Sequence, residues 1–308
     1  MQPSSIEALS HRFGIPDVVR ILAGRGGLPK IHIASSAAQA ELYLHGAHLT
    51  SWQPEEEDEV LFLSDRSRWE DGQPIRGGIP ICFPWFRAKQ GDATAPKHGF
   101  VRIRSWQLDS VALDPDGSVI VVASTAADDF SRRWWPCDFR LAYRLRIGRS
   151  LHLELIVANT GSAPFQFEEA LHTYFNVGLA QRVEVRGLDG VAYLDNTEGN
   201  RRKIQSGPLL FSQATDNAYL DAPSPVDLVD PVLRRTLTTA KENSASTVVW
   251  NPGREGAASI PDLGEEEWQR MACVEASNVL TCAVTLPPGQ EHRMAAILTV
   301  ARPSPTSR

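Results

Sequence analysis

The sequence has few cysteines and no long apolar run. Its 308 residues include only four cysteines, Cys82, Cys137, Cys273 and Cys282, which lack both the CxxC spacing of zinc sites and the density of secreted disulfide scaffolds. No stretch approaches the roughly 18 consecutive apolar residues that a membrane-spanning helix needs. The first residues, MQPSSIEALSHRFGIP, lack the basic and apolar segments of a secretion signal. We therefore expect structural thiols, no metal site, no membrane association and a cytoplasmic location.

An excess of basic residues is also missing. The formal net charge is −6 and the isoelectric point is near 5.8. A protein that neutralises many phosphates along a nucleic acid needs a surface rich in lysine and arginine. The charge balance therefore argues against a nucleic-acid partner, but a few arginines could still hold a small anionic ligand.

Helical periodicity is scarce after the first twenty residues. The segment SSIEALSHRFG predicts one short amphipathic helix, capped by Ser4 or Ser5 and ended by Gly14. From about residue 30, short stretches rich in Val, Ile, Leu and Tyr alternate with turn residues, and we interpret them as strands. They are KIHIAS, AELYLHG, VLFLS, VIVVAS, FRLAYRLRIG, SLHLELIVANTG, STVVW, MACVEA, LTCAVTL and MAAILTV.

The spacing of these stretches favours one antiparallel all-β domain. Many of the 21 prolines and 22 glycines lie between the predicted strands, as tight connections require. Helices do not alternate with the strands, so a doubly wound parallel sheet is disfavoured. No low-complexity linker or internal repeat divides the chain, so a single domain of about 300 residues is preferred over two.

The segment PIRGGIPICFPWF, which begins at residue 74, predicts a shaped loop. Glycines and prolines interrupt its apolar run too often for a helix or a long strand. Arg76 precedes Gly77 and Gly78, whose missing side chains would leave an open approach to a ligand. The alternative is a surface arginine at a turn.

The segment KHGFVR follows in the chain. If it is extended, His98, Phe100 and Arg102 point to the same face. One histidine beside one arginine is a weak signal, and taken alone His98 is more often a structural histidine than a catalytic one.

The stretch FQFEEALHTYFNVG, residues 165–178, contains a candidate acid–base group. In a strand, Glu168, Ala170, His172 and Tyr174 would share one face. The apolar and aromatic neighbours of His172 disfavour its charged form, which can bring its pKa into a range useful for proton transfer. The alternative is a buried histidine bonded to a backbone carbonyl.

Glu275 lies within the apolar strand segment MACVEASNV. A carboxylate buried there without a partner would cost several kcal/mol, so it must face a polar cavity, an ion-pair partner or solvent. In a cavity it would serve as a base. Periodicity alone does not separate this from an ion pair with an arginine.

Seven segments together resemble the glucose-6-phosphate 1-epimerase family, also called hexose-6-phosphate mutarotases, of the aldose-epimerase superfamily. In chain order they are PIRGGIPICFPWF, HGFVR, EEALHTYFNVG, GLDGVAYLDNT, TDNAYL, WNPG and MACVEASNV. The resemblance implies a galactose-mutarotase-like β-supersandwich over residues 30–302, preceded by an N-terminal helical extension, 1–29, and followed by a flexible tail, 303–308. It also implies interconversion of the α and β anomers of a hexose 6-phosphate, such as glucose 6-phosphate, without metal or organic cofactor. We expect a monomer, although no sequence feature reports the oligomeric state.

The resemblance also assigns roles to six residues. His172 matches the family's catalytic acid and Glu275 its catalytic base. His98 matches a histidine beside the sugar ring, and Asp216 in TDNAYL an acidic residue that binds sugar hydroxyls. The remaining two, Arg76 and Arg102, match arginines around the substrate and are candidates for binding its phosphate.

Two positions depart from the family pattern. Arg87 in PWFRAKQG stands where relatives carry a glycine, which brings a further cation close to the expected substrate. Asn217 stands where relatives tend to carry an arginine, which would remove a charge near Asp216.

Three other functions remain open. An aldose 1-epimerase acting on free hexoses would use the same acid–base pair. A glycoside hydrolase would use the two carboxylates Asp216 and Glu275. A non-catalytic carbohydrate-binding protein would stack sugars on aromatic platforms such as Trp85, Trp134 and Trp135, although it would need neither His172 nor Glu275.

Overall fold

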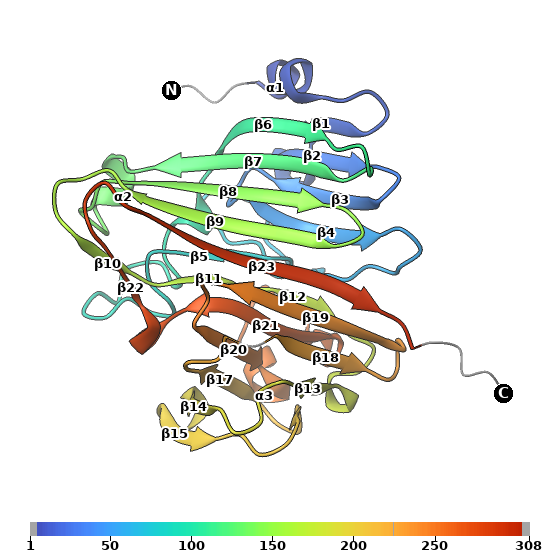
Figure 1. Ribbon diagram of the computed structural model, residues 1–308, viewed down its shortest axis with the longest axis vertical. Helices are drawn as coiled ribbons and strands as arrows, with labels where there is room; N and C mark the ends of the chain where they lie inside the picture. Colours follow the sequence, from blue (N-terminus) through green and yellow to red (C-terminus); the bar gives the residue numbers. More distant parts are fainter. Residues whose placement is uncertain (1–4, 224, 304–308) are drawn as a thin grey trace.

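A computed structural model describes residues 5–223 and 225–303 of the chain (Figure 1). It opens with α1 (Ile6–Phe13), whose first turn is capped by the Ser5 hydroxyl and whose last turn ends at Gly14. The predicted helix is therefore confirmed, with Ser5 as its cap. The alternative cap Ser4 and residues 304–308 of the predicted tail lie outside the described residues.

The rest of the chain forms four antiparallel sheets, so the predicted all-β class is confirmed. In spatial order, the nine-stranded sheet contains β16 (Leu209–Leu210), β13 (Glu184–Arg186), β18 (Val226–Asp230), β19 (Arg235–Glu242), β23 (Glu291–Ala301), β9 (Leu151–Asn159), β8 (Phe139–Ile147), β7 (Val119–Ala126) and β6 (Gln107–Leu113). The eight-stranded sheet contains β15 (Arg201–Ile204), β14 (Ala192–Asp195), β17 (Thr215–Tyr219), β20 (Ser246–Asn251), β21 (Met271–Asn278), β11 (Glu169–Leu171) and β5 (Ile81–Cys82), with β12 (Tyr174–Asn176) also paired to β21.

Two smaller sheets complete the architecture. The four-stranded sheet contains β1 (Val19–Ala23), β2 (Pro29–Ala34), β3 (Ala38–Tyr43) and β4 (His48–Pro54). A two-stranded ribbon joins β10 (Phe165–Phe167) to β22 (Val284–Leu286). The segment before residue 30 thus contributes the strand β1 as well as the predicted helix, and Phe13, Val19 and Ile21 join the main core.

Short helical turns connect the strands. They are α2 (Asp129–Arg132), α3 (Gly253–Ala258), η1 (Arg25–Gly27), η2 (Val101–Ile103), η3 (Ala180–Arg182), η4 (Asn196–Glu198), η5 (Glu267–Arg270) and η6 (Leu280–Cys282). Within the described ranges, no helix has the length and apolar character needed to cross a membrane.

The main core lies between the sheets and follows from strand alternation. On β9, Leu151, Leu153, Leu155 and Val157 are fully buried, and the residues between them are more exposed. The same apolar cluster contains residues of β2 and β3 and of the inner face of β21. The nine-stranded sheet therefore packs against the eight-stranded and the four-stranded sheets, as a sandwich requires.

Two predicted strands differ in the structure. The segment VLFLS is buried, but Leu61 and Leu63 form only isolated bridges, to Phe175 and Gly77. Its apolar residues are buried without forming a regular strand. A short buried run of this kind has the same sequence pattern as a buried strand. LTCAVTL is only partly extended, because its first half forms η6 before β22 begins.

The last strands of the chain lie in the middle of the two large sheets. β21 joins the part built from β20, β17, β14 and β15 to the part built from β11 and β5. β23 likewise lies between β19 and β9 and joins the two halves of the nine-stranded sheet. Figure 1 shows β23 running diagonally through the centre of its sheet.

Candidate active site

The outer face of the eight-stranded sheet forms the floor of a cavity. Residues opposite each other in antiparallel strands point to the same face. Asp216 on β17 pairs with Trp250 on β20, and Val248 on β20 pairs with Glu275 on β21, which places all four side chains on one face. Val274, the residue before Glu275 on β21, belongs to the main core on the opposite face of the sheet. Packing of β21 therefore aims Glu275 into the cavity.

The loop predicted around residues 74–86 forms one wall. Its only regular part is the two-residue strand β5. Gly77 has φ of 108°, and a Cβ at this position would lie 2.4 Å from the Phe62 carbonyl oxygen. The chain can therefore fold back against its neighbours only with glycine here. The predicted shaped loop is confirmed, and it carries Arg76 to the cavity.

The segment KHGFVR is not extended, so the predicted common face is wrong. His98 and Gly99 have φ of 62° and 75°, in the left-handed region, and η2 follows at once. These turns send Phe100 into the main core, while His98 and Arg102 both line the cavity.

The stretch FQFEEALHTYFNVG breaks into three short strands, β10, β11 and β12. His172 lies between the last two, and its backbone N–H donates to the Pro80 carbonyl. The ring of Tyr174 stacks on the imidazole of His172 at a centroid distance of 4.7 Å and an interplanar angle of 10°. Both rings face the cavity, while Phe175 joins the main core.

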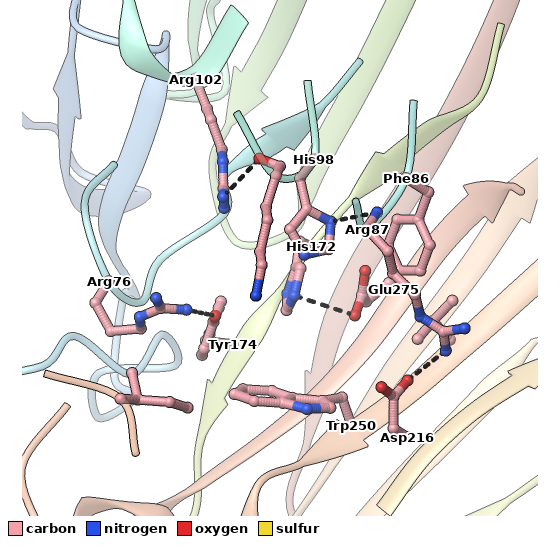
Figure 2. A pocket seen from close by; sticks show the side chains of 13 residues that line it. Arg76, Phe86, Arg87, His98, Arg102, His172, Tyr174, Asp216, Trp250 and Glu275 are labelled. Atoms are coloured by element: carbon pink, nitrogen blue, oxygen red, sulfur yellow. Dashed lines mark hydrogen bonds and ion pairs between the residues drawn. The ribbon is translucent and has the colours of Figure 1, made fainter. Parts of the chain in front are cut away.

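These elements bring all six predicted site residues around one cavity of about 200 Å³ (Figure 2). Drug-sized ligands occupy pockets of roughly 300–1,000 Å³, so this volume suits a small ligand. The cavity is also lined by residues that sequence reasoning did not assign: Phe86, Arg87, Lys97, Tyr174, Val248, Trp250 and Ile260. Three of these had a signal: Arg87 departs from the family pattern as a cation close to the expected substrate, Tyr174 follows His172 at strand spacing, and Trp250 begins the segment WNPG.

His172 and Glu275 meet in the centre of the cavity. The Nε2 atom of His172 lies 3.4 Å from the Oε1 atom of Glu275, whose side chain has no exposed surface. Neither carboxylate oxygen of Glu275 has a hydrogen-bond partner among the described residues. Buried polar groups are rarely left unpaired, so this carboxylate points to a ligand that donates hydrogen bonds.

Burial shifts the pKa values of this pair in opposite directions. Desolvation, followed by the charge of Asp216, raises the pKa of Glu275 well above its usual value. Desolvation, followed by Arg102 and Arg76, holds the pKa of His172 well below its usual value. Without a ligand, the pair therefore favours a protonated carboxyl beside a neutral imidazole.

The two predicted arginines differ in how their guanidinium groups are engaged. Arg76 donates from Nε and Nη2 to Asp262 and from Nη1 to the Tyr174 hydroxyl, 2.9 Å away. Arg102 is 8% exposed and donates to the Lys97 carbonyl, but its Nε is unpartnered and no carboxylate of the described chain pairs with it. Arg102 is therefore a buried cation without a counter-ion in the described structure.

Asp216 is held at the other end of the cavity. Its Oδ1 accepts from Arg87 Nη2 at 2.5 Å and its Oδ2 from Asn196 Nδ2 at 2.6 Å. Asn217 points away from the cavity, as strand alternation dictates, and lies 3.5 Å from the Tyr219 hydroxyl. A residue at position 217 therefore does not face Asp216 across the cavity, and Asn217 does not leave Asp216 without a cation. The cation beside Asp216 is Arg87.

A family model of aldose 1-epimerases matches residues 29–299. This chain belongs to the aldose 1-epimerase family. A protein of Cenchrus ciliaris named "Putative glucose-6-phosphate 1-epimerase" is 35% identical over 82% of this chain and 79% of its own length. A protein of the same name from Escherichia coli K12 is 34% identical over 78% of this chain and 79% of its own length.

Solved structures agree with this membership in the aldose 1-epimerase family. The crystal structure of a "putative mutarotase" from Salmonella typhimurium matches with a TM-score of 0.88 and 30% identity, over 94% of this chain and 96% of the other. Solved galactose mutarotase-like proteins share the same fold. The predicted galactose-mutarotase-like sandwich is thus confirmed.

The aromatic platforms of the carbohydrate-binding alternative do not line the cavity. Trp85 is 7% exposed, and its indole N–H donates to the Pro96 carbonyl. Trp134 and Trp135 pack against the main core. The aromatic groups that line the cavity are instead Phe86, Tyr174 and Trp250, around the His172–Glu275 pair.

Proposed function

We propose that this aldose 1-epimerase family member interconverts the α and β anomers of a hexose 6-phosphate, without a metal or organic cofactor. One observation carries the proposal: a buried His172–Glu275 pair shares a small cavity with Arg102, a cation that pairs with no carboxylate among the described residues. The pair supplies the proton transfers of ring opening, and Arg102 supplies a site for an anionic group. The names of the relatives support the same substrate class.

Anomer exchange requires that one proton leave the anomeric hydroxyl and one reach the ring oxygen. We assign Glu275 as the base at O1 and His172 as the acid at O5. The ring opens to the aldehyde, the C1–C2 bond rotates, and the ring closes on the other face with the two roles exchanged. His98 hydrogen-bonds the sugar beside the ring and steadies the developing charge.

The number of protons carried by Glu275 and His172 together fits this assignment. A neutral carboxyl beside a neutral imidazole carries the same single proton as a carboxylate beside an imidazolium. Sugar hydroxyls that donate to Glu275 would stabilise its carboxylate, and a nearby phosphate dianion would stabilise the imidazolium. Substrate binding therefore favours the charged form, in which Glu275 accepts a proton and His172 donates one.

The charged groups of the cavity give the substrate a direction. Figure 2 shows Arg76 and Arg102 on one side of the His172–Glu275 pair, and Asp216 with Arg87 on the other. A hexose 6-phosphate would place its phosphate toward Arg102 and its ring hydroxyls toward Asp216. Lys97 lines the cavity as well and adds a second cation near the phosphate.

The proposed activity is tested by anomer-exchange NMR on phosphorylated and free hexoses side by side. We expect faster α/β exchange of glucose 6-phosphate than of free glucose or galactose. Addition of EDTA should leave the rate unchanged, because the assigned proton transfers need no metal. A preference for free galactose would instead indicate an aldose 1-epimerase of free hexoses. Loss of activity with EDTA, restored by zinc or magnesium, would contradict the cofactor-free mechanism.

Arg102 is expected to discriminate between phosphorylated and free sugars. Hydrogen bonds to charged groups contribute about 1.5–3 kcal/mol, so R102A should lower kcat/KM for hexose 6-phosphate roughly 10- to 100-fold. The rate with a free hexose should change much less. Steady-state kinetics on both sugars measures the contrast.

Arg76 provides the comparison for this test. Its guanidinium already binds Asp262 and Tyr174, whose ring stacks on His172. R76A should therefore lower the rate with both sugars, whether or not Arg76 also contacts the phosphate. Equal losses on both sugars in R102A would contradict a phosphate role for Arg102.

A further inference from the structure

Arg87 ties together three parts of the cavity wall. Its Nη2 donates to Asp216 on β17, and its Nη1 donates to the Asn200 side chain at 3.1 Å. Its backbone N–H donates to Nδ1 of His98 at 3.2 Å, and its carbonyl accepts from the His98 backbone N–H at 2.7 Å. The side chain and the backbone of Arg87 thus hold two different groups that face the ligand.

The geometry of Arg87 is specific rather than that of a loose surface arginine. Its φ is 60°, an uncommon conformation for a residue with a side chain. Its side chain is 20% exposed and spans from the loop after β5 to the turn between β14 and β15, where Asn196 and Asn200 lie. Because Arg87 and Asn196 each bind one oxygen of Asp216, the orientation of that carboxylate is fixed.

The pair also acts on Glu275. Asp216 and Glu275 face the same cavity, so the negative charge of Asp216 disfavours ionisation of Glu275. Arg87 opposes this effect and favours the carboxylate form. The bond between Arg87 and Asp216 therefore lets Asp216 accept hydrogen bonds while Arg87 offsets the effect of its charge on Glu275.

We propose that Arg87 is a positioning residue, which holds Asp216 for the sugar hydroxyls and offsets the charge of Asp216 at Glu275. This inference rests on the proposed function only for its kinetic readout. Other groups also surround Glu275 from the neighbouring elements: His98, His172, Tyr174, Arg76, Lys97, Arg102, Cys82, Cys273 and Asp216. Among these, Asp216 is the one whose side chain is bonded to the Arg87 guanidinium.

The decisive variant is R87M, which keeps a long side chain and removes the charge. The productive pair carries one proton, and the raised pKa of Glu275 governs its loss, so a higher pKa of Glu275 moves the basic limb of the kcat/KM profile to higher pH. We expect a shift of about one pH unit, the lower end for removal of a nearby opposite charge. Below the basic limb, the rate should fall about 10-fold, since one unit lowers the share of the charged carboxylate–imidazolium form tenfold.

Three comparison variants separate charge from structure. R87K keeps the charge but loses the planar fork, so its basic limb should stay near that of the parent while KM rises. In R87M/D216N the charge that Arg87 offsets is gone, so the limb should return toward the parent value. R186M removes an exposed arginine paired with Glu184 on the nine-stranded sheet and should leave the profile unchanged.

A second measurement does not depend on activity. The infrared carboxyl band of protonated Glu275, identified by its absence in E275Q, should titrate at higher pH in R87M than in the parent. An unshifted titration, or a rate loss in R87M that is equal at every pH, would overturn the role of Arg87. A parent without anomerase activity whose Glu275 titration still shifts in R87M would contradict the proposed function and leave the charge coupling standing.

Discussion

E275Q is expected to lower the rate of anomer exchange by at least about 10²-fold, because a positioned proton-transfer group contributes about 10²- to 10⁴-fold. Glutamine keeps the shape of the side chain but does not accept the proton of the anomeric hydroxyl. The fold should survive, because neither oxygen of Glu275 bonds to another described residue. Exchange NMR measures the rate, and circular dichroism should match that of the parent.

The pH dependence of stability gives the same variant a second readout. Burial raises the pKa of Glu275, so its contribution to folding is fully present at low pH and is lost as the pH rises through the folded-state pKa. Glutamine does not ionise and removes this loss. E275Q should therefore unfold at a temperature no lower than that of the parent at pH 8.

Glu169 offers a matched control for Glu275. It is also fully buried in the eight-stranded sheet, but its Oε1 accepts hydrogen bonds from Asn278 and His292 at 2.8 Å, and it does not line the cavity. E169Q should lower the unfolding temperature while turnover is retained. Parent-like exchange rates in E275Q would remove Glu275 from the mechanism.

H172N is expected to show the second large effect, again a loss of at least about 10²-fold. Asparagine keeps a hydrogen-bonding group near Glu275 but does not deliver a proton to the ring oxygen. Its shape also allows Tyr174 to remain in place, so near-parent circular dichroism is expected. H292N, which alters a histidine bonded to Glu169 outside the cavity, is the matched control.

The double variant E275Q/H172N tests whether the two residues act together. Groups that act as a unit lose most of their effect when either is removed. We therefore expect the double variant to be no more than a few-fold slower than either single variant, measured by exchange NMR on glucose 6-phosphate. Losses that multiply would show that the two groups contribute independently, and a parent-like rate in H172N would exclude His172 as the acid.

Local patterns predicted the regular parts of the fold. Strands β8 and β9 alternate buried and less buried residues over nine positions each, and such long alternation leaves little ambiguity. The two-residue strands β5 and β16 have no comparable pattern. They exist because neighbouring strands supply their hydrogen-bond partners, which is information that the local sequence does not contain.

The sequence predicted six residues of the candidate site but not the contacts that these residues make. The family resemblance named six residues that the structure places around one cavity. The bond from Arg87 to Asp216 joins positions 129 residues apart and depends on a left-handed loop residue. Likewise, the ion pair that distinguishes Arg76 from Arg102 depends on Asp262, which lies in a turn far along the chain.

The central positions of β21 and β23 impose an order on the making of this protein. During synthesis, the partners of these strands emerge first, and each large sheet remains in two pieces with unpaired edges until residues 271–301 are available. Such distant pairings form slowly and leave edges open to wrong partners. Because Glu275 lies on β21, the proposed base is added with the strand that joins the sheet, so a growing chain completes its candidate site and its sheet in the same step.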